Sequence, residues 1–378
     1  MGDSYFNKSW FYGIHEYGFG NSSFFTFMSE FNRPWSGLPY IEALVFIVLF
    51  LFSMFGNILI FYQMFQTKST RTVTNCMIAN LAMADILFSF GSPFIAITRL
   101  TGDWIFGNAV CKVFVYLLFT CAMVMIWTMT VISIDRHICI NKTTSKKMTP
   151  QVAVAIIIIT WVVCLLCFIP LALYFHTRSF LFGHDYVTIC TLSWPKTSGF
   201  RASIFFTVLS CLLGFVIPIA VMSMNYFKII RKFVGSRRAI LHNHNRVDVL
   251  NSNSLKTRKN RDQRDVKLIK TLLLLVFLFM LMWLPIFVVF VIILIDGMMD
   301  NMQVPSIALI ITVCIALANA CVNPFLYGVI NDKIRRAIFK CFACKNAVST
   351  SGTGSSIRQS IRAISYSQNS SNSENMTR

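Results

Sequence analysis

The chain has 378 residues, of which 56% are hydrophobic and only 13% charged, and its formal net charge is +19. Soluble domains usually carry about 25% charged residues, so this composition argues against a large soluble protein and favours membrane-spanning segments. A basic chain could also bind nucleic acid, but here the basic residues lie in short stretches beside apolar segments, which disfavours that function.

The beginning of the chain is polar and aromatic and lacks the short apolar run of a cleavable signal peptide. Residues 1–40 are therefore predicted to form an extracellular tail. Asn7 and Asn21 each begin an Asn-x-Ser pattern, which makes them candidate glycosylation sites. The pattern arises easily by chance. A further copy at Asn141, on the opposite predicted side of the membrane, illustrates this.

Apolar stretches long enough to cross a membrane, each of roughly 20 residues or more, recur along the chain. They cover residues 41–65, 73–99, 108–140, 150–174, 201–233, 264–296 and 305–330. The pattern predicts an all-α membrane protein with a seven-transmembrane helix bundle over residues 41–330.

Basic residues predict the orientation of the bundle. Lys68 and Arg71 follow the first span, Lys142 and Lys147 follow the third, and the segment 231–264 follows the fifth. These connections lie on one side if the spans alternate, and Lys and Arg prefer the cytoplasmic side. The chain is thus expected to be a multi-pass plasma-membrane protein with its N-terminus outside and its C-terminus inside.

Most of the 12 cysteines lie within apolar spans, but four lie outside them. Cys111 and Cys190 fall on the predicted extracellular side, where two cysteines suggest one disulfide. Cys341 and Cys344 follow the last span on the inner side. Their C-x-x-C spacing could indicate a metal or redox site, but no second ligand pair accompanies it, so palmitoylation beside the membrane is preferred.

The chain after the last span has two predicted parts. Residues 331–342 alternate apolar and basic side chains, which predicts a short amphipathic eighth helix on the membrane lipids. Residues 343–378 are rich in Ser and Thr and are predicted to be a disordered cytoplasmic tail, whose phosphorylation would create a binding site for arrestin. The basic segment 234–263 is expected to be a solvated loop.

Charged residues at membrane depth within the apolar spans include Asp85, Asp135 and Arg136. A charge in hydrocarbon costs several kcal/mol, so such residues are rare and usually functional. The alternative for the Asp135–Arg136 pair is that both side chains merely reach toward the lipid headgroups.

Every apolar stretch also carries a short motif. The motifs are Gly56-Asn57, Leu81-Ala82-Met83-Ala84-Asp85, Asp135-Arg136-His137, Trp161, Pro218 with Tyr226, Met282-Trp283-Leu284-Pro285 and Asn323-Pro324-Phe325-Leu326-Tyr327. In this order, over residues 41–344, they resemble the rhodopsin-like family of G-protein-coupled receptors. The resemblance implies a receptor, not an enzyme, that transmits the binding of an extracellular ligand to a heterotrimeric G protein.

The resemblance also implies roles for individual residues. In the family, the arginine equivalent to Arg136 is restrained by acids equivalent to Asp135 and Asp265 and is released toward the G protein, and tyrosines equivalent to Tyr226 and Tyr327 stabilise the released state. The residues that connect ligand site and G-protein site would be Ile126, Pro218 and Phe279.

A sodium site is the one cofactor that the resemblance implies. Asp85, Asn319 and Asn323 match its ligands, but Met125 stands where the family usually has serine. A thioether is a poor ligand for a hard cation, so Asp85 could instead be hydrogen-bonded to the two asparagines.

The expected ligand pocket is apolar and aromatic. Leu118 stands where amine receptors have aspartate and Leu317 where opsins have their retinal lysine. The predicted ligand-binding residues are Phe88, Arg99, Phe119, Trp194, Phe206, Trp283 and Ile286. Arg99 is predicted to bind a ligand carboxylate, or else to pair with Asp103 or to reach toward the headgroups.

Within the family the chain resembles the receptors for long-chain free fatty acids, receptor 4 in particular, at Arg99, Phe88, Trp283 and the segment 189–195. It departs from them at Gly214. A fatty-acid-like lipid is therefore the favoured ligand and a neuropeptide the alternative, since residues 69–75 and 104–107 resemble neuropeptide receptors. A transporter or channel would need charges along a midplane path, which the sequence lacks beyond Asp85.

Overall fold

A computed structural model of the protein describes residues 9–15, 20–31, 35–66, 72–140, 148–182, 185–195, 201–244, 252–299 and 303–330. Asn7, the expected eighth helix, Cys341, Cys344 and the C-terminal tail lie outside these residues. The side chains of Asn21, Asp265 and Tyr327 are also not described, although their backbones are.

The seven predicted spans are confirmed, since the described residues contain seven helical segments long and apolar enough to cross a membrane. The helices are α1 (Leu38–Gln66), α2 (Val73–Ser89), α3 (Gly91–Thr101), α4 (Gly107–Ile140), α5 (Pro150–Cys167), α6 (Ile169–Tyr174), α7 (Ala202–Cys211), η2 (Leu212–Val216), α8 (Ile217–His244), α9 (Ser252–Met299) and α10 (Ser306–Ile330). Large apolar side chains such as Phe52, Ile159 and Phe277 are exposed on the bundle surface, as expected of faces turned toward lipid.

Three of the spans consist of more than one helical segment. The second is interrupted at Phe90, three residues before Pro93, and the fourth at Phe168, two residues before Pro170. Proline has no N–H to donate to the preceding turn and its ring clashes with it, so a helix is interrupted there. The fifth span contains η2, a π-helical turn of the kind that often occurs at functional sites.

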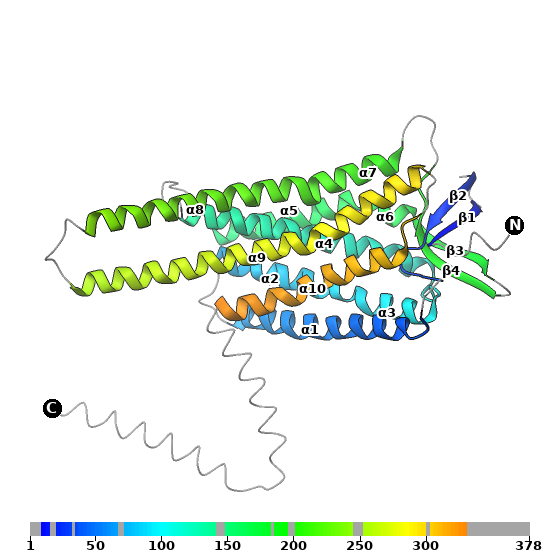
Figure 1. The fold of residues 1–378 in the computed structure, drawn as a ribbon, viewed down its shortest axis with the longest axis horizontal. Coiled ribbons are helices and arrows are strands. Elements are labelled where there is room, and N and C mark those ends of the chain that lie inside the picture. The colour runs from blue at the N-terminus through cyan, green and yellow to red at the C-terminus, as the bar shows by residue number, and fades with distance from the viewer. Residues whose placement is uncertain are drawn as a thin grey trace, which may run out of the picture. The chain divides into compact units, whose positions relative to one another are not determined.

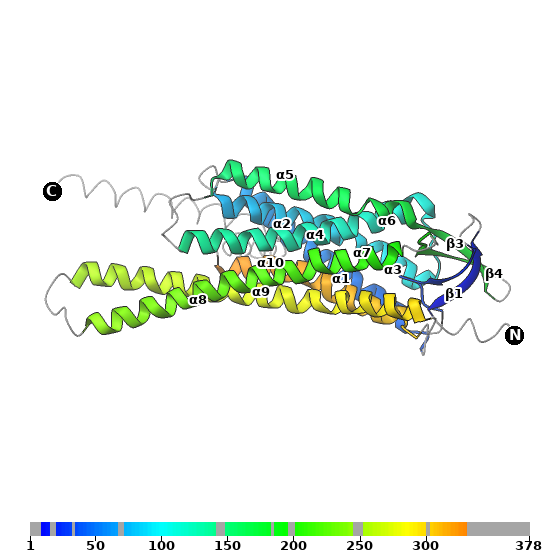
Figure 2. The same ribbon diagram turned by 90° about the horizontal axis from the view of Figure 1, so that it is seen from above.

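Two helices continue beyond the membrane span on the side opposite the strands (Figure 1, Figure 2). Helix α8 runs to His244 and α9 begins at Ser252, so the expectation of a solvated loop over residues 234–263 is wrong for most of that segment. The sequence between Pro218 and Pro285 contains no proline, and its many Lys, Arg and Leu residues are good helix formers.

Two antiparallel hairpins add β-structure to the helical bundle. Strand β1 (Trp10–His15) pairs with β2 (Gly20–Phe25), and β3 (Phe175–Phe182) pairs with β4 (Asp185–Leu192). Figure 1 shows both hairpins at the same end of the bundle. This end is called the outer end here, following the predicted orientation. The described part of the N-terminal segment is therefore folded, which the expectation of a simple tail missed.

The hairpins pack on each other through aromatic side chains. Phe11 and Phe24 of the N-terminal hairpin form a buried cluster with Ile189 of β4, and Phe31 and Phe180 pack against it. The ring centroids of Phe11 and Phe180 lie 4.7 Å apart. Aromatic side chains bury large apolar areas, so this cluster holds the two hairpins together.

Candidate ligand cavity and signalling residues

A cavity of about 620 Å³ lies at the outer end of the bundle. Six of the predicted ligand-binding residues line it, namely Phe88, Phe119, Trp194, Phe206, Trp283 and Ile286. Pockets for small ligands or the ends of larger ones usually measure about 300–1,000 Å³ and are mainly apolar. The size and lining of the cavity therefore suit ligand binding.

Aromatic rings form the walls and the inner end of this cavity. The Trp283 ring lies 5.9 Å from Phe88 and 6.0 Å from Phe279, which is one helical turn farther from the outer end. Phe119 contacts Phe290 at 5.3 Å between ring centroids. Trp283 lines the cavity and also contacts the buried Phe279. A movement of its ring would therefore displace Phe279, which lies farther from the outer end.

Arg99 does not line the cavity, in contrast to the prediction that it binds a ligand carboxylate. Its guanidinium is fully buried and forms two hydrogen bonds with Glu42 of α1, at 2.7 Å from Nε to Oε2 and 2.8 Å from Nη2 to Oε1. It also donates to the backbone oxygen of Met28. The alternative partner Asp103 accepts a hydrogen bond from the Thr188 backbone instead. The acid on α1 was missed because the sequence does not show which charges meet.

The N-terminal segment forms part of the cavity wall, which sequence reasoning also missed. Trp10, Ser23, Phe24, Phe25, Phe27 and Met28 line the cavity. The Trp10 ring packs on Gly297 near the outer end of α9, with its Cη2 atom 3.2 Å from the position that a Cβ would take there. The many aromatic residues before the first span were the available signal, because such residues are uncommon in a solvated tail.

Buried hydrogen bonds fix this segment to α10. The Glu30 carboxylate accepts hydrogen bonds from the Ser9 hydroxyl at 3.1 Å, from the Ile307 backbone N–H at 3.1 Å and from the Ser306 hydroxyl. Ser306 and Ile307 lie at the N-terminus of α10, where the helix dipole favours a negative charge. Elsewhere the Thr191 hydroxyl donates to the Phe25 backbone oxygen at 2.8 Å. The N-terminal segment is therefore an integral part of the outer end.

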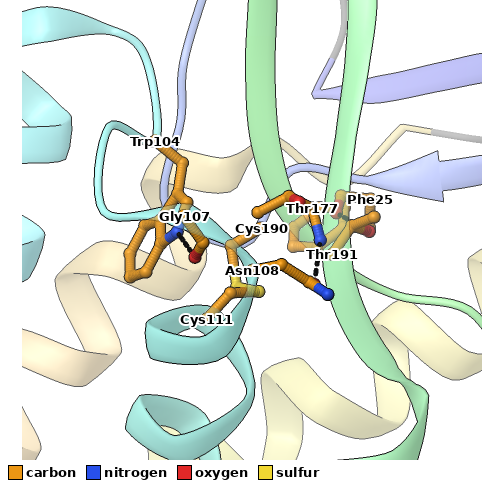
Figure 3. Close-up of a disulfide and its surroundings, with 8 residues drawn as sticks. All are labelled: Phe25, Trp104, Gly107, Asn108, Cys111, Thr177, Cys190 and Thr191. Atoms are coloured by element: carbon orange, nitrogen blue, oxygen red, sulfur yellow. Dashed lines mark hydrogen bonds between the residues drawn. A yellow bond between two sulfur atoms is a disulfide. The ribbon is translucent and has the colours of Figure 1, made fainter.

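The predicted disulfide between Cys111 and Cys190 is confirmed and joins α4 to β4 (Figure 3). Near it, the Asn108 side-chain oxygen accepts a hydrogen bond from the Thr177 backbone N–H at 3.1 Å. The Trp104 indole donates to the Gly107 backbone oxygen at 2.9 Å. The β3–β4 hairpin is thus attached to α4 by covalent and polar contacts beside the cavity.

The intramembrane pair at the inner end of α4 is in direct contact. Arg136 Nη2 lies 2.6 Å from Asp135 Oδ2 and also donates to the hydroxyl of Thr74 on α2. Asp135 is buried and Arg136 is only partly exposed. The arginine is therefore restrained from two helices, and Thr74 is a partner that the sequence analysis did not identify.

The other predicted signalling residues are buried. Ile126, Pro218, Tyr226 and Phe279 all lie in the bundle interior. The Tyr226 hydroxyl has no hydrogen-bond partner among the described residues. The roles of Asp265 and Tyr327 stay predictions, because their side chains are not described.

The candidate sodium ligands are only partly brought together. Asp85 is fully buried and accepts a hydrogen bond from Asn323 at 2.9 Å. Its Oδ1 atom has no partner among the described residues, whereas the amide of Asn319 donates to the Met282 sulfur. Asp85 could offer one carboxylate oxygen to a cation, but Met125 provides no oxygen ligand. Sodium binding stays a prediction.

Comparison with known proteins gives a family and several relatives. The family described as "7 transmembrane receptor (rhodopsin family)" matches residues 56–327. The neuropeptide Y receptor type 2 of Cavia porcellus is 30% identical over 312 residues, which cover 80% of this chain and 76% of that receptor. The human receptor of the same name is 28% identical over 312 residues, with the same shares covered.

A second kind of relative matches over a shorter segment. The somatostatin receptor type 2 of Sus scrofa is 32% identical over 212 residues, which are 55% of this chain and 56% of that receptor. The chain thus spans little more than half the length of this relative.

Proposed function

Because the chain belongs to the seven-transmembrane receptors of the rhodopsin family, we propose that it is a G-protein-coupled receptor for an extracellular peptide. Proteins of this family are receptors rather than enzymes. The proposal concerns the class of ligand and the coupling of its binding to a heterotrimeric G protein.

The main support for a peptide ligand is that the similar proteins are named as peptide receptors. Similarity to a neuropeptide Y receptor covers 80% of this chain, and similarity to a somatostatin receptor covers 55% of it. The aromatic cavity supports the same choice, because its 620 Å³ would hold the end of a peptide while the rest contacts the hairpins. A fatty acid is less well supported, because Arg99, the cation expected to bind its carboxylate, is held by Glu42 and does not line the cavity.

The inner end supports coupling to a G protein. Arg136 is a charged residue at the inner end of α4, and among the described side chains it is restrained by Asp135 and Thr74. Release of such a residue can convert a helix movement into a new polar binding surface. Arrestin, membrane lipids, glycosylation at Asn7 and Asn21, and palmitoylation remain further proposals on the grounds given by the sequence.

A G-protein activation assay tests this function. Membranes with the receptor would be exposed to a panel of free-acid and amidated neuropeptides and, separately, to long-chain fatty acids. We expect a peptide to stimulate nucleotide exchange at nanomolar concentration, and the Arg136→Ala variant to bind that peptide without stimulating exchange. Activation by long-chain acids and by none of the peptides would refute the peptide proposal.

A further inference from the structure

We propose that the cavity selects a ligand end that is neutral or acidic and rich in hydrogen-bond acceptors, and that it rejects a basic end. The inference rests on the proposed function in taking the cavity as the ligand site. Carbonyl and carboxylate groups share the required chemistry. Trp10, Arg201 and Trp283 would provide the selectivity.

The acidic side chains described at the outer end are all engaged within the chain. Glu42 pairs with Arg99, and Glu30 accepts hydrogen bonds at the start of α10. Asp103 accepts from the Thr188 backbone at 2.6 Å, and Asp296 accepts from the backbone of Gln303 at 2.7 Å and of Val304 at 3.0 Å. None of these four acids lines the cavity. A cationic ligand end would therefore lose its hydration without meeting a counter-charge among the described side chains.

Hydrogen-bond donors, in contrast, lie unused in the cavity wall. The indole N–H groups of Trp10 and Trp283 are buried, and neither has a hydrogen-bond partner among the described residues. An indole nitrogen can only donate, so both groups need an acceptor, which a ligand in the cavity can provide. The hydroxyl of Ser193, also in the wall, has no partner either and can serve both roles. An unmade buried hydrogen bond is costly, so a ligand with acceptors gains more here than one without.

Arg201 is the one charged residue in the described cavity wall. It precedes α7 as its N-cap residue and is exposed, so its positive charge lies at the rim. The charge attracts anions and repels cations at the entrance, with an effect weakened by solvent. Buried donors and a cationic rim therefore act in the same direction.

A free cysteine in the wall allows the charge preference to be measured without knowing the ligand. Cys211 lines the cavity and is partly buried. The receptor in membranes would be treated with anionic sulfonatoethyl or cationic trimethylammonioethyl methanethiosulfonate, and the modification rate at Cys211 would be read by peptide mass spectrometry. The modification rate for each reagent is first divided by the rate of the same reagent with a free thiol in solution. The normalised ratio is then the anionic rate divided by the cationic rate.

We expect this normalised ratio to exceed one in the wild type and to fall by about 3- to 10-fold in Arg201→Gln, as for one unit charge acting across several ångströms in partly screened surroundings. Lys112→Gln is the matched control. It removes the same charge from the outer part of α4 but from outside the cavity wall, so it should leave the ratio unchanged. A Ser203→Cys variant on a Cys211→Ala background gives a second reading nearer the rim.

A wild-type ratio at or below one, or equal effects of Arg201→Gln and Lys112→Gln, would overturn the proposal. Peptides with different C-terminal ends distinguish a carboxylate from a neutral carbonyl as the bound group. A free-acid peptide should lose more potency in Arg201→Gln than its carboxamide, whereas both should weaken in Trp283→Phe. Activation by a peptide whose essential end is an arginine amide would count against the selectivity while supporting the peptide function. A ratio above one with no active peptide would leave the selectivity standing and refute the peptide function.

Discussion

Arg99 and Glu42 form a buried ion pair in the outer half of the bundle, with the guanidinium fully buried. Two such charges are expensive to remove from water, and their mutual attraction offsets this cost only while both are present. Arg99 also donates a hydrogen bond to the backbone oxygen of Met28, so the pair connects the N-terminal segment with α1 and α3.

We therefore expect Arg99→Gln to destabilise the receptor by about 3–5 kcal/mol, because it leaves the mostly buried Glu42 charge unpaired. The double variant Arg99→Gln with Glu42→Gln should recover part of this loss, since it removes both charges. Thermal unfolding in detergent and surface expression would measure the effect. If Arg99→Gln is as stable as the wild type and only ligand potency falls, the ligand role of Arg99 would be favoured over its structural one.

Gly56 marks a close approach of α1 to α10. A Cβ atom at this position would lie 2.7 Å from the Cβ and Cγ atoms of Pro324, and a proline ring cannot turn away. Gly56→Ala should thus destabilise the protein by about 1–3 kcal/mol, as overpacking usually does.

Gly235→Ala is the control, because no described atom lies within 4 Å of the added Cβ on the exposed surface of α8. Alanine favours a helix over glycine by about 0.5–1 kcal/mol, so this variant should be neutral or slightly more stable. Equal melting temperatures for the two variants would show that the close approach of Gly56 to Pro324 does not make alanine destabilising there.

At the scale of elements, both hairpins contribute residues to the cavity wall. The β3–β4 hairpin is held by the disulfide to α4, whereas the described part of the β1–β2 hairpin is held by aromatic packing and by hydrogen bonds around Glu30. Noncovalent attachment makes the N-terminal hairpin the easier of the two to displace.

Glu30→Gln should loosen the N-terminal hairpin, because it removes the negative charge at the N-terminus of α10. Such a charge contributes about 0.3–2 kcal/mol, which corresponds to a roughly 2- to 30-fold change in an opening equilibrium. Modification of Cys211 by either methanethiosulfonate reagent should accelerate within that range.

Ser179→Ala is the matched change on the other hairpin, where it removes an exposed hydrogen bond to Thr188. It should leave the modification rate of Cys211 unaltered. Equal rates in wild type and Glu30→Gln would show that reagents reach the cavity by another route.

At the scale of the whole molecule, the cavity and the Asp135–Arg136 pair occupy opposite parts of α4. Ile126 is the cavity-lining residue of α4 that lies nearest to this pair in the sequence, and Arg136 reaches Thr74 of α2 near the inner end. Ligand binding can affect the inner end only if the ligand binds the restrained and released arrangements with different affinities. If the proposed function is correct, we expect the strength of this restraint to influence the basal activity.

Asp135→Asn should raise basal signalling, since it weakens a charge-assisted hydrogen bond worth about 1.5–3 kcal/mol and shifts the equilibrium by roughly 10- to 150-fold. Thr74→Val removes a neutral partner of Arg136 and should have a smaller effect. Nucleotide exchange without ligand, at matched surface expression, measures both. Unchanged basal exchange in Asp135→Asn would show that this contact does not restrain the receptor.

The sequence by itself determined the membrane architecture and much of the site. A span needs roughly 20 apolar residues whatever its neighbours are, so the seven helices could be predicted without knowledge of their packing. The two cysteines on the predicted outer side left one pairing, and Phe88, Phe119 and Trp283 line the cavity as expected of aromatic residues in outer halves of spans.

Only the tertiary structure decided which distant residues meet. The sequence shows that burying Arg99 is costly, but not that Glu42, 57 positions earlier, neutralises it. It shows aromatic residues before the first span, but not that Trp10 reaches Gly297 and lines the cavity. Charge pairing and aromatic packing depend on distances in space, and hydrophobic pattern along the chain carries no information about such contacts between helices and hairpins.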